Sequence, residues 1–191
     1  LLSCPGIFHN GRRGELMERL VRHSPEVLTR VFLCNSGTES VEAAIKLARA
    51  STGRSGLVTA MRGFHGRTLG ALSATFKYRD AFEPLLSGNT FVPLNNIEKL
   101  DAAVGDSTSA VILEVVQGEG GVRPAQGEYL SAARRLCTEL GLTSDEMDAY
   151  FVAEAEAEAV ATLRAEADIV IGTTPPGAPS PLRVAAAEPH Y

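Results

Sequence analysis

The sequence is poor in cysteine and has no long apolar run. Its three cysteines, Cys4, Cys34 and Cys137, are odd in number and far apart, so they form neither a disulfide framework nor a C-x-x-C metal site. We expect free thiols in a reducing compartment, and therefore a cytoplasmic protein. No stretch approaches the ~20 apolar residues of a membrane helix. The sequence does not open on a basic leader followed by an apolar core, so we expect no signal peptide.

The chain also lacks an excess of positive charge. Residues 1–141 hold 16 basic and 14 acidic side chains, whereas residues 142–191 hold 2 basic and 9 acidic ones. Neither part has the basic face that binding to nucleic acid requires. The break in charge coincides with an Ala/Glu-rich stretch that is followed by four prolines within residues 175–181. We therefore expect residues 1–141 to form one domain and residues 142–191 to be an unrelated or degenerate tail.

Strand-like and helix-like segments alternate from residue 31 to residue 141. Short apolar runs predict buried strands, and amphipathic stretches predict helices. The predicted strands are 30–34, the start of 56–68, 90–95 and 109–116. The predicted helices are 13–24, 39–50, 96–105 and 127–141, and segment 69–82 is predicted to be a helix and its exit. This alternation is typical of an α/β domain with a mostly parallel sheet.

The helix predicted over residues 39–50 has a clear apolar stripe, which leaves Glu42 and Lys46 on the solvent side. The stripe consists of Val41, Ala44, Ile45 and Ala48. The first turn of such a helix has free N–H groups and suits a phosphate. Just before it, Gly37 would let an anion approach the backbone, and Thr38 would add a hydroxyl donor.

A plain helix cap explains the same corner, because Ser36 and Glu39 have the spacing of a capping box. The chain has neither a P-loop nor a dinucleotide-binding fingerprint. Two further polar corners favour a site. Segment 63–68 places an aromatic residue and a cation just after a strand, and segment 114–122 places two carboxylates at the end of another. Ligands bind at this edge of a parallel sheet.

Three segments together resemble the class III pyridoxal-phosphate aminotransferases of the ornithine/acetylornithine type. They are NSGTES with the following EAA and KLAR, GFHGRT, and QGEGGVRPA, and the resemblance covers about residues 10–141. It implies part of the three-layer α/β large domain of an aspartate-aminotransferase-like (fold type I) enzyme. It also implies pyridoxal 5′-phosphate as cofactor and a homodimer. The implied reaction moves a terminal amino group from N-acetylornithine or a carrier-linked lysine to 2-oxoglutarate.

The resemblance also assigns roles to residues. Ser36, Gly37 and Thr38 would hold the cofactor's phosphate. Phe64 would stack on the pyridine ring, with His65 beside it.

The remaining assigned residues concern the substrate and the pyridine nitrogen. Arg67 would bind the substrate's α-carboxylate, and Glu119 would lie near the substrate. Glu114 would orient the acidic partner of the pyridine nitrogen without touching the cofactor.

The family's Schiff-base lysine is not recognisable in the sequence. The three lysines, Lys46, Lys77 and Lys99, have the surroundings of ordinary surface lysines. The family's acidic partner of the pyridine nitrogen is also missing, because Asp145-Glu146 follows no apolar strand. We therefore expect no catalytic residue within these 191 residues, and a chain that is truncated and inactive alone.

Two alternatives remain open. The chain could be a non-catalytic binding or regulatory module that pairs with an intact paralogue. It could also be a bifunctional remnant, because the segments LTSDEMDAYF and ADIVIGTTP in the tail resemble parts of ornithine cyclodeaminase.

Overall fold

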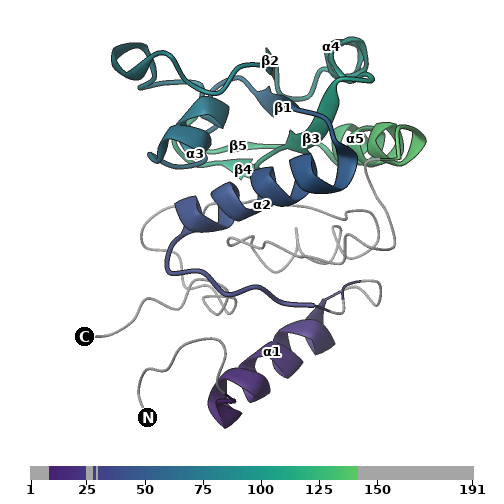
Figure 1. Cartoon of the computed structure of the whole chain (residues 1–191). Helices are drawn as coiled ribbons and strands as arrows, with labels where there is room; N and C mark the ends of the chain where they lie inside the picture. Colours follow the sequence, from purple (N-terminus) through teal and green to yellow (C-terminus); the bar gives the residue numbers. More distant parts are fainter. Residues whose placement is uncertain (1–8, 25–27, 29, 142–191) are drawn as a thin grey trace.

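The computed structural model describes residues 9–24, 28 and 30–141 of the 191-residue chain (Figure 1). The elements are, in chain order, α1 (Gly11–His23), α2 (Gly37–Thr52), β1 (Gly56–Ala60), α3 (Leu69–Ala74), the 3-10 helix η1 (Asp80–Phe82), β2 (Asn89–Val92), α4 (Ile97–Ala103), β3 (Thr108–Ile112), β4 (Val116–Gln117), β5 (Arg123–Pro124) and α5 (Gly127–Glu139). The predicted tail 142–191 and the Asp145-Glu146 pair lie outside the described residues. No helix in the described part of the chain is long and apolar enough to cross a membrane.

The sheet at the centre of the fold is parallel, as the sequence predicts. Its strand order is β2-β1-β3, and β1 pairs in parallel with both neighbours. All five residues of β1 are buried, which is typical of a central parallel strand covered on both faces. The short strands β4 and β5 form a separate antiparallel pair.

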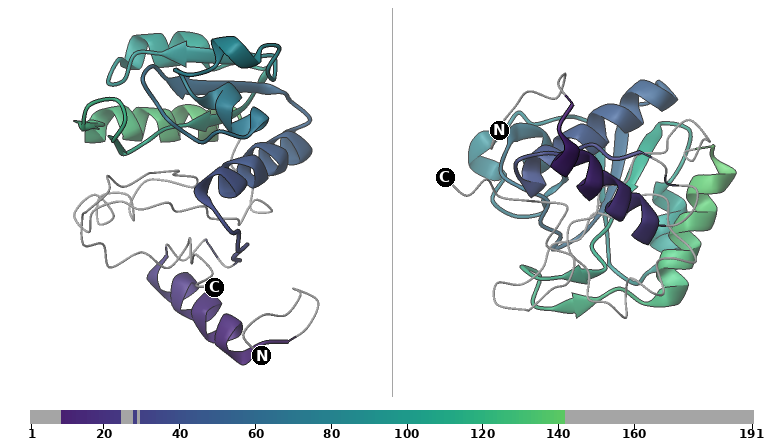
Figure 2. Two further views of the ribbon diagram at one scale, coloured as in Figure 1. Left: turned by 90° about the vertical axis from the view of Figure 1, so that its left-hand side faces the viewer. Right: turned by 90° about the horizontal axis from the view of Figure 1, so that it is seen from below.

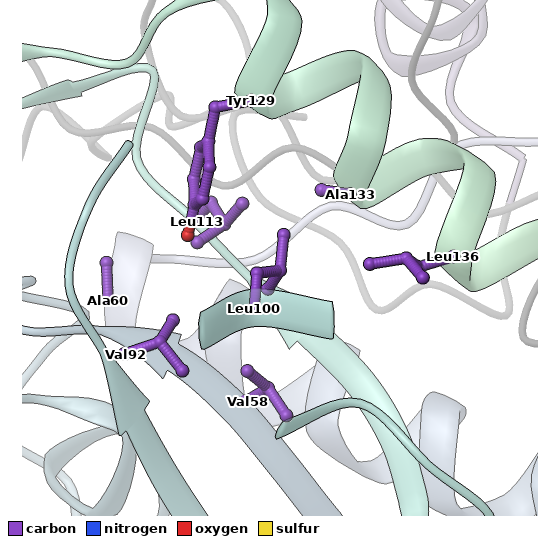
Figure 3. Close-up of a cluster of buried hydrophobic side chains, with 8 residues drawn as sticks. All are labelled: Val58, Ala60, Val92, Leu100, Leu113, Tyr129, Ala133 and Leu136. Atoms are coloured by element: carbon purple, nitrogen blue, oxygen red, sulfur yellow. The ribbon is translucent and has the colours of Figure 1, made fainter. Parts of the chain in front are cut away.

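Helices cover both faces of the sheet, so the domain has three layers (Figures 1 and 2). On one face, Leu57 of β1 packs with Ile45 of α2 and Ala71 of α3. On the other face, Val58 and its neighbours pack against α4 and α5. Figure 3 shows this second cluster, which consists of Val58, Ala60, Val92, Leu100, Leu113, Tyr129, Ala133 and Leu136. Since alternate residues of a strand point to opposite faces, β1 contributes to both cores.

Helix α2 matches its prediction closely. Ser36 is the N-cap, and Gly53 ends the helix with a left-handed backbone (φ 67°), as is common for glycine. The whole predicted apolar stripe is buried, and Lys46 is exposed. Glu42 was expected in solvent, but its carboxylate accepts hydrogen bonds from the segment that begins α3.

The prediction of a strand over residues 30–34 is wrong. Only Arg30 forms an isolated bridge, and residues 31–34 have no regular structure. Phe32 is 63% exposed, so no sheet face covers this apolar run. A short apolar run forms a strand only where a neighbouring strand pairs with it, so the run by itself is an ambiguous signal.

Two other segments hold shorter elements. In segment 69–82, predicted to be a helix and its exit, the helix occupies only Leu69–Ala74, because Thr75 adopts an extended backbone and uses its hydroxyl to bind the neighbouring loop. The strand predicted over 109–116 ends at Ile112, and residues 113–115 leave the sheet.

Helix α1 lies apart from the sheet and its covering helices (Figures 1 and 2). None of its residues is buried, although the spacing of Leu16, Leu20 and Val21 places them on one helical face. Asn10 caps its first turn by accepting from the N–H groups of Arg12 and Arg13.

Candidate active site

The chain places the N-terminus of α2 at the carboxyl edge of the sheet without a strand before it. Helix α2 is joined to β1 by residues 53–55, and the two elements run in opposite directions (Figure 1). The start of α2 therefore lies near the end of β1. This is the edge at which parallel sheets bind ligands.

The corner before α2 is capped, but its first N–H groups stay available. Ser36 Oγ accepts from the N–H of Glu39 at 3.3 Å. The Glu39 carboxylate accepts from the backbone N–H of Asn35 at 2.8 Å, one residue before the N–H that a capping box would bind. Within the described residues, no hydrogen bond is recorded for the N–H groups of Gly37 and Thr38, which a helix leaves free. A Cβ added to Gly37 would meet nothing within 4 Å.

The loop after β1 contacts this corner directly. The hydroxyl oxygens of Thr38 and Thr68 are 2.9 Å apart, and the N–H of Thr68 donates to Thr38 Oγ1 at 3.4 Å. Gly66 (φ 133°) makes this approach possible, because a Cβ on it would lie 2.3 Å from Thr38 Oγ1. Two of the three motif segments therefore meet.

Segment 114–122, which overlaps the third motif, joins this group through Glu114. This side chain is only 1% exposed, and its Oε2 accepts from the backbone N–H of Phe64 at 3.0 Å. A carboxylate with so little exposure is held by its partners. Segments 36–38, 63–68 and 114 therefore form one connected group at the sheet edge.

Phe64 and Arg67 lie together on the same loop. The Arg67 guanidinium carbon is 5.8 Å from the centroid of the half-buried Phe64 ring, and Arg67 itself is exposed. The ring of Tyr78 meets the Phe64 ring edge to face, with 6.5 Å between the centroids. An aromatic ring beside an exposed cation suits a flat, anionic ligand.

His65 is the most completely buried of the histidines in the described segments. It is 2% exposed, its backbone N–H donates to Thr75 Oγ1 at 2.9 Å, and neither ring nitrogen has a hydrogen-bond partner among the residues that the structure describes. Burial lowers the pKa of His65 to about 4, because desolvation penalises the charged imidazolium. Its Nε2 and Glu114 Oε2 lie 3.1 and 3.3 Å from the position of a Cβ added to Gly63.

The loop after β4 carries the last predicted residue. Gln117 is fully buried, and its Nε2 donates to the carbonyl of Met61, which follows β1. Glu119 is exposed in the turn that begins at Gly118. The structure thus places Glu119 in the loop tied to β1, and its role near the substrate stays a prediction.

Sequence reasoning missed four residues of this group. Three of them lie inside the quoted motif segments, but their roles depend on contacts between segments that are far apart in the chain, so no local pattern indicates those roles. They are Glu42, Thr68, Thr75 and Gln117.

The residues present fit part of pyridoxal phosphate. The free N–H groups of Gly37 and Thr38, with open space over Gly37, suit the phosphate. The half-exposed face of Phe64 suits the ring. The three lysines of the chain, Lys46, Lys77 and Lys99, are all exposed.

The model of the aminotransferase class-III family matches residues 1–172 of this chain. The match therefore extends beyond the three motifs on both sides. The [LysW]-aminoadipate semialdehyde transaminase of Deinococcus radiodurans is 48% identical over 157 residues, which cover 79% of this chain. The acetylornithine aminotransferase of Methanopyrus kandleri is 46% identical over 144 residues, which cover 74% of this chain.

Solved structures show the same fold. The ornithine aminotransferase of Toxoplasma gondii, which holds pyridoxal phosphate at partial occupancy, has a TM-score of 0.65 at 25% identity, over 78% of this chain and 36% of that one. The taurine:2-oxoglutarate aminotransferase of Bifidobacterium kashiwanohense has a TM-score of 0.70 over 80% of this chain and 39% of that one, and its 24% identity shows the fold alone.

The chain spans less than two fifths of the length of these proteins. It covers 37% of the Deinococcus relative and 37% of the Methanopyrus relative. The α/β fold described above is accordingly a part of the larger fold of pyridoxal-phosphate transaminases of fold type I. By its match to the family model and its identity to these relatives, this chain belongs to the class-III aminotransferase family.

Proposed function

We propose that residues 36–119 form the phosphate- and ring-binding part of the active site of a pyridoxal-phosphate-dependent aminotransferase. One observation carries the proposal. Segments 36–38, 63–68 and 114, far apart in the chain, meet at the carboxyl edge of the sheet through the contacts Thr38–Thr68 and Phe64–Glu114. Ser36, through its cap of the first turn of α2, and the N–H groups of Gly37 and Thr38 would hold the phosphate.

The other residues would position the ring and the substrate. Phe64 would stack on the pyridine ring, with the neutral imidazole of His65 buried in the same loop. Arg67 would bind the α-carboxylate, and Glu119 would lie close to the substrate. The cofactor supplies an electron sink when bound, and the protein supplies orientation and electrostatics. Glu114 would act through the loop whose Phe64 N–H it binds.

The relatives suggest the reaction and its substrates. The names of the two relatives, a [LysW]-aminoadipate semialdehyde transaminase and an acetylornithine aminotransferase, support an amino-group transfer of arginine or lysine biosynthesis, with 2-oxoglutarate as acceptor. The donor would be N-acetylornithine or a carrier-linked lysine. The resemblance to the family adds a cytoplasmic homodimer to the proposal. The exposed positions of all three lysines support the proposal that the 191 residues alone do not turn over. The division into a domain at 1–141 and a tail at 142–191 also stays a proposal.

The test is cofactor binding by the 191-residue chain. We expect pyridoxal phosphate to perturb the amide signals of Gly37 and Thr38, and inorganic phosphate to compete with it. The bound cofactor should absorb as a free aldehyde, and borohydride should attach none of it to the protein. If neither ligand shifts these amides, the assignment of the phosphate site is wrong. Formation of glutamate from N-acetylornithine and 2-oxoglutarate would instead contradict the expected inactivity.

A non-catalytic module is the second candidate. The exposed lysines favour it, because binding of the cofactor does not need them but turnover does. Co-purification with a full-length aminotransferase would support this role.

A further inference from the structure

A chain of hydrogen bonds links α2 to the start of α3 beside the proposed phosphate corner. Thr68 Oγ1 donates to Glu42 Oε1 at 2.5 Å, and the N–H of Ala71 donates to the same oxygen at 3.1 Å. Thr38 Oγ1 lies 2.9 Å from Thr68 Oγ1. Figure 1 shows α3 beside the N-terminal end of α2, where these contacts are made.

The number of hydroxyl protons decides which residue is the donor in each of these hydrogen bonds. A threonine hydroxyl has one proton to donate. Thr68 gives its proton to Glu42, so Thr38 must be the donor in the contact between the two hydroxyls. The hydroxyl proton of Thr38 is therefore already engaged. An anion at the start of α2 would therefore be bound by the N–H groups of Gly37 and Thr38 and not by the Thr38 hydroxyl.

The capping of α3 shows that these hydrogen bonds do more than cap a single helix. Thr68 is the N-cap residue of α3, but its side chain makes no capping hydrogen bond. The N–H of Ala71, which an N-cap side chain would ordinarily bind, is bound by Glu42 of α2 instead. The hydroxyl of Thr68 is thus used between the helices and not within α3.

Two glycines allow the helices to come this close. A Cβ on Gly66 would lie 2.3 Å from Thr38 Oγ1, and a Cβ on Gly70 would lie 2.3 Å from Glu42 Oε2. Gly66 belongs to segment 63–68, which carries Phe64 and Arg67, and Gly70 belongs to α3, which follows it directly. The contact between Glu42, Thr68 and Thr38 therefore sets the position of this segment relative to the start of α2.

We propose that Glu42 and Thr68 are positioning residues for the cofactor site. Through Thr38 they hold the loop of Phe64 and Arg67 in register with the start of α2, so that the phosphate and the ring are bound together. This proposal rests on the proposed function. It adds that Thr68 contributes to binding of the whole cofactor and not to binding of phosphate alone.

The experiment compares variants of the 191-residue chain. Thr68→Val removes the hydroxyl and both of its hydrogen bonds with little change in shape. Thr68→Ser keeps the hydroxyl, and Glu42→Ala interrupts the chain from α2. Thr52→Val is the matched control, because its hydroxyl bonds only near the other end of α2. The measurements are amide hydrogen exchange without ligand, and titration with pyridoxal phosphate and with inorganic phosphate.

We expect Thr68→Val to speed amide exchange of residues 64–68 by roughly tenfold, and Glu42→Ala to do so at Ala71. Thr68→Val should lower the affinity for pyridoxal phosphate by roughly five- to tenfold, whereas the affinity for inorganic phosphate should change by no more than about twofold. Thr68→Ser should restore both values, and Thr52→Val should change neither.

Two results would overturn the proposal. One is exchange at residues 64–68 that Thr68→Val leaves unchanged. The other is an equal loss of affinity for both ligands, which would assign Thr68 to the phosphate corner itself. If the unaltered chain binds no pyridoxal phosphate, the proposed function fails. The exchange of residues 64–68 then decides by itself whether Thr68 holds the loop in register.

Discussion

The burial of His65 makes the stability of the fold dependent on pH. Its pKa falls from 6.5 to about 4 because burial disfavours the imidazolium. Between these two values the unfolded chain binds a proton at this residue and the folded chain does not. The free energy of unfolding therefore falls as the pH falls through this window, by about 1.4 kcal/mol per pH unit. The full loss is about 3 kcal/mol at pH 4, and above pH 6.5 the residue makes no such contribution.

Urea unfolding between pH 7 and pH 4 tests this reasoning. We compare the unaltered chain with His65→Gln, which cannot take up the proton, and with His9→Gln, which removes an exposed imidazole. The stability of the unaltered chain relative to His65→Gln should decrease by about 3 kcal/mol from pH 6.5 to pH 4. The His9→Gln variant should still lose the full amount of unfolding free energy as the pH falls. A difference between the unaltered chain and His65→Gln that does not change with pH would refute a neutral, desolvated imidazole.

Three further substitutions test the packing, two at the site and one in the second core cluster. Gly66→Ala should destabilise the fold by about 2 kcal/mol or more, because of its φ of 133° and the overlap with Thr38 Oγ1. Gly37→Ala, with open space around it, should change the thermal midpoint little, and equal effects of the two would contradict this account. Tyr129→Phe should be neutral or stabilising by up to about 1 kcal/mol, since its buried hydroxyl has no hydrogen-bond partner within the described part of the chain. A clear loss of stability on thermal unfolding would show that this hydroxyl is satisfied.

Local pattern predicts the helices and strands well where burial is periodic. The stripe of α2 is buried as expected, because spacing at three and four residues places side chains on one helical face. The parallel sheet also follows from the alternation of strands and helices. The strand predicted over residues 30–34 does not form, because a strand needs a paired neighbour, and local composition does not reveal whether one is present. The helix within segment 69–82 ends at Ala74 because the Thr75 hydroxyl forms hydrogen bonds with the backbone of His65 and Gly66.

The sequence by itself determined the family, the parallel α/β architecture and the three segments that meet at the sheet edge. Each of these features depends on residue types at a fixed spacing, and such a pattern is complete within a single stretch of sequence. Only the tertiary structure decided how the segments touch: Thr38 against Thr68, Glu114 against Phe64, and Glu42 against the start of α3. These contacts join residues that are about 30 to 50 positions apart. The contacts of Thr38 and Glu42 form because α2 and β1 run in opposite directions, which brings the start of α2 beside the end of β1. The contact between Glu114 and Phe64 forms because β1 and β3 are parallel neighbours, whose carboxyl ends lie side by side.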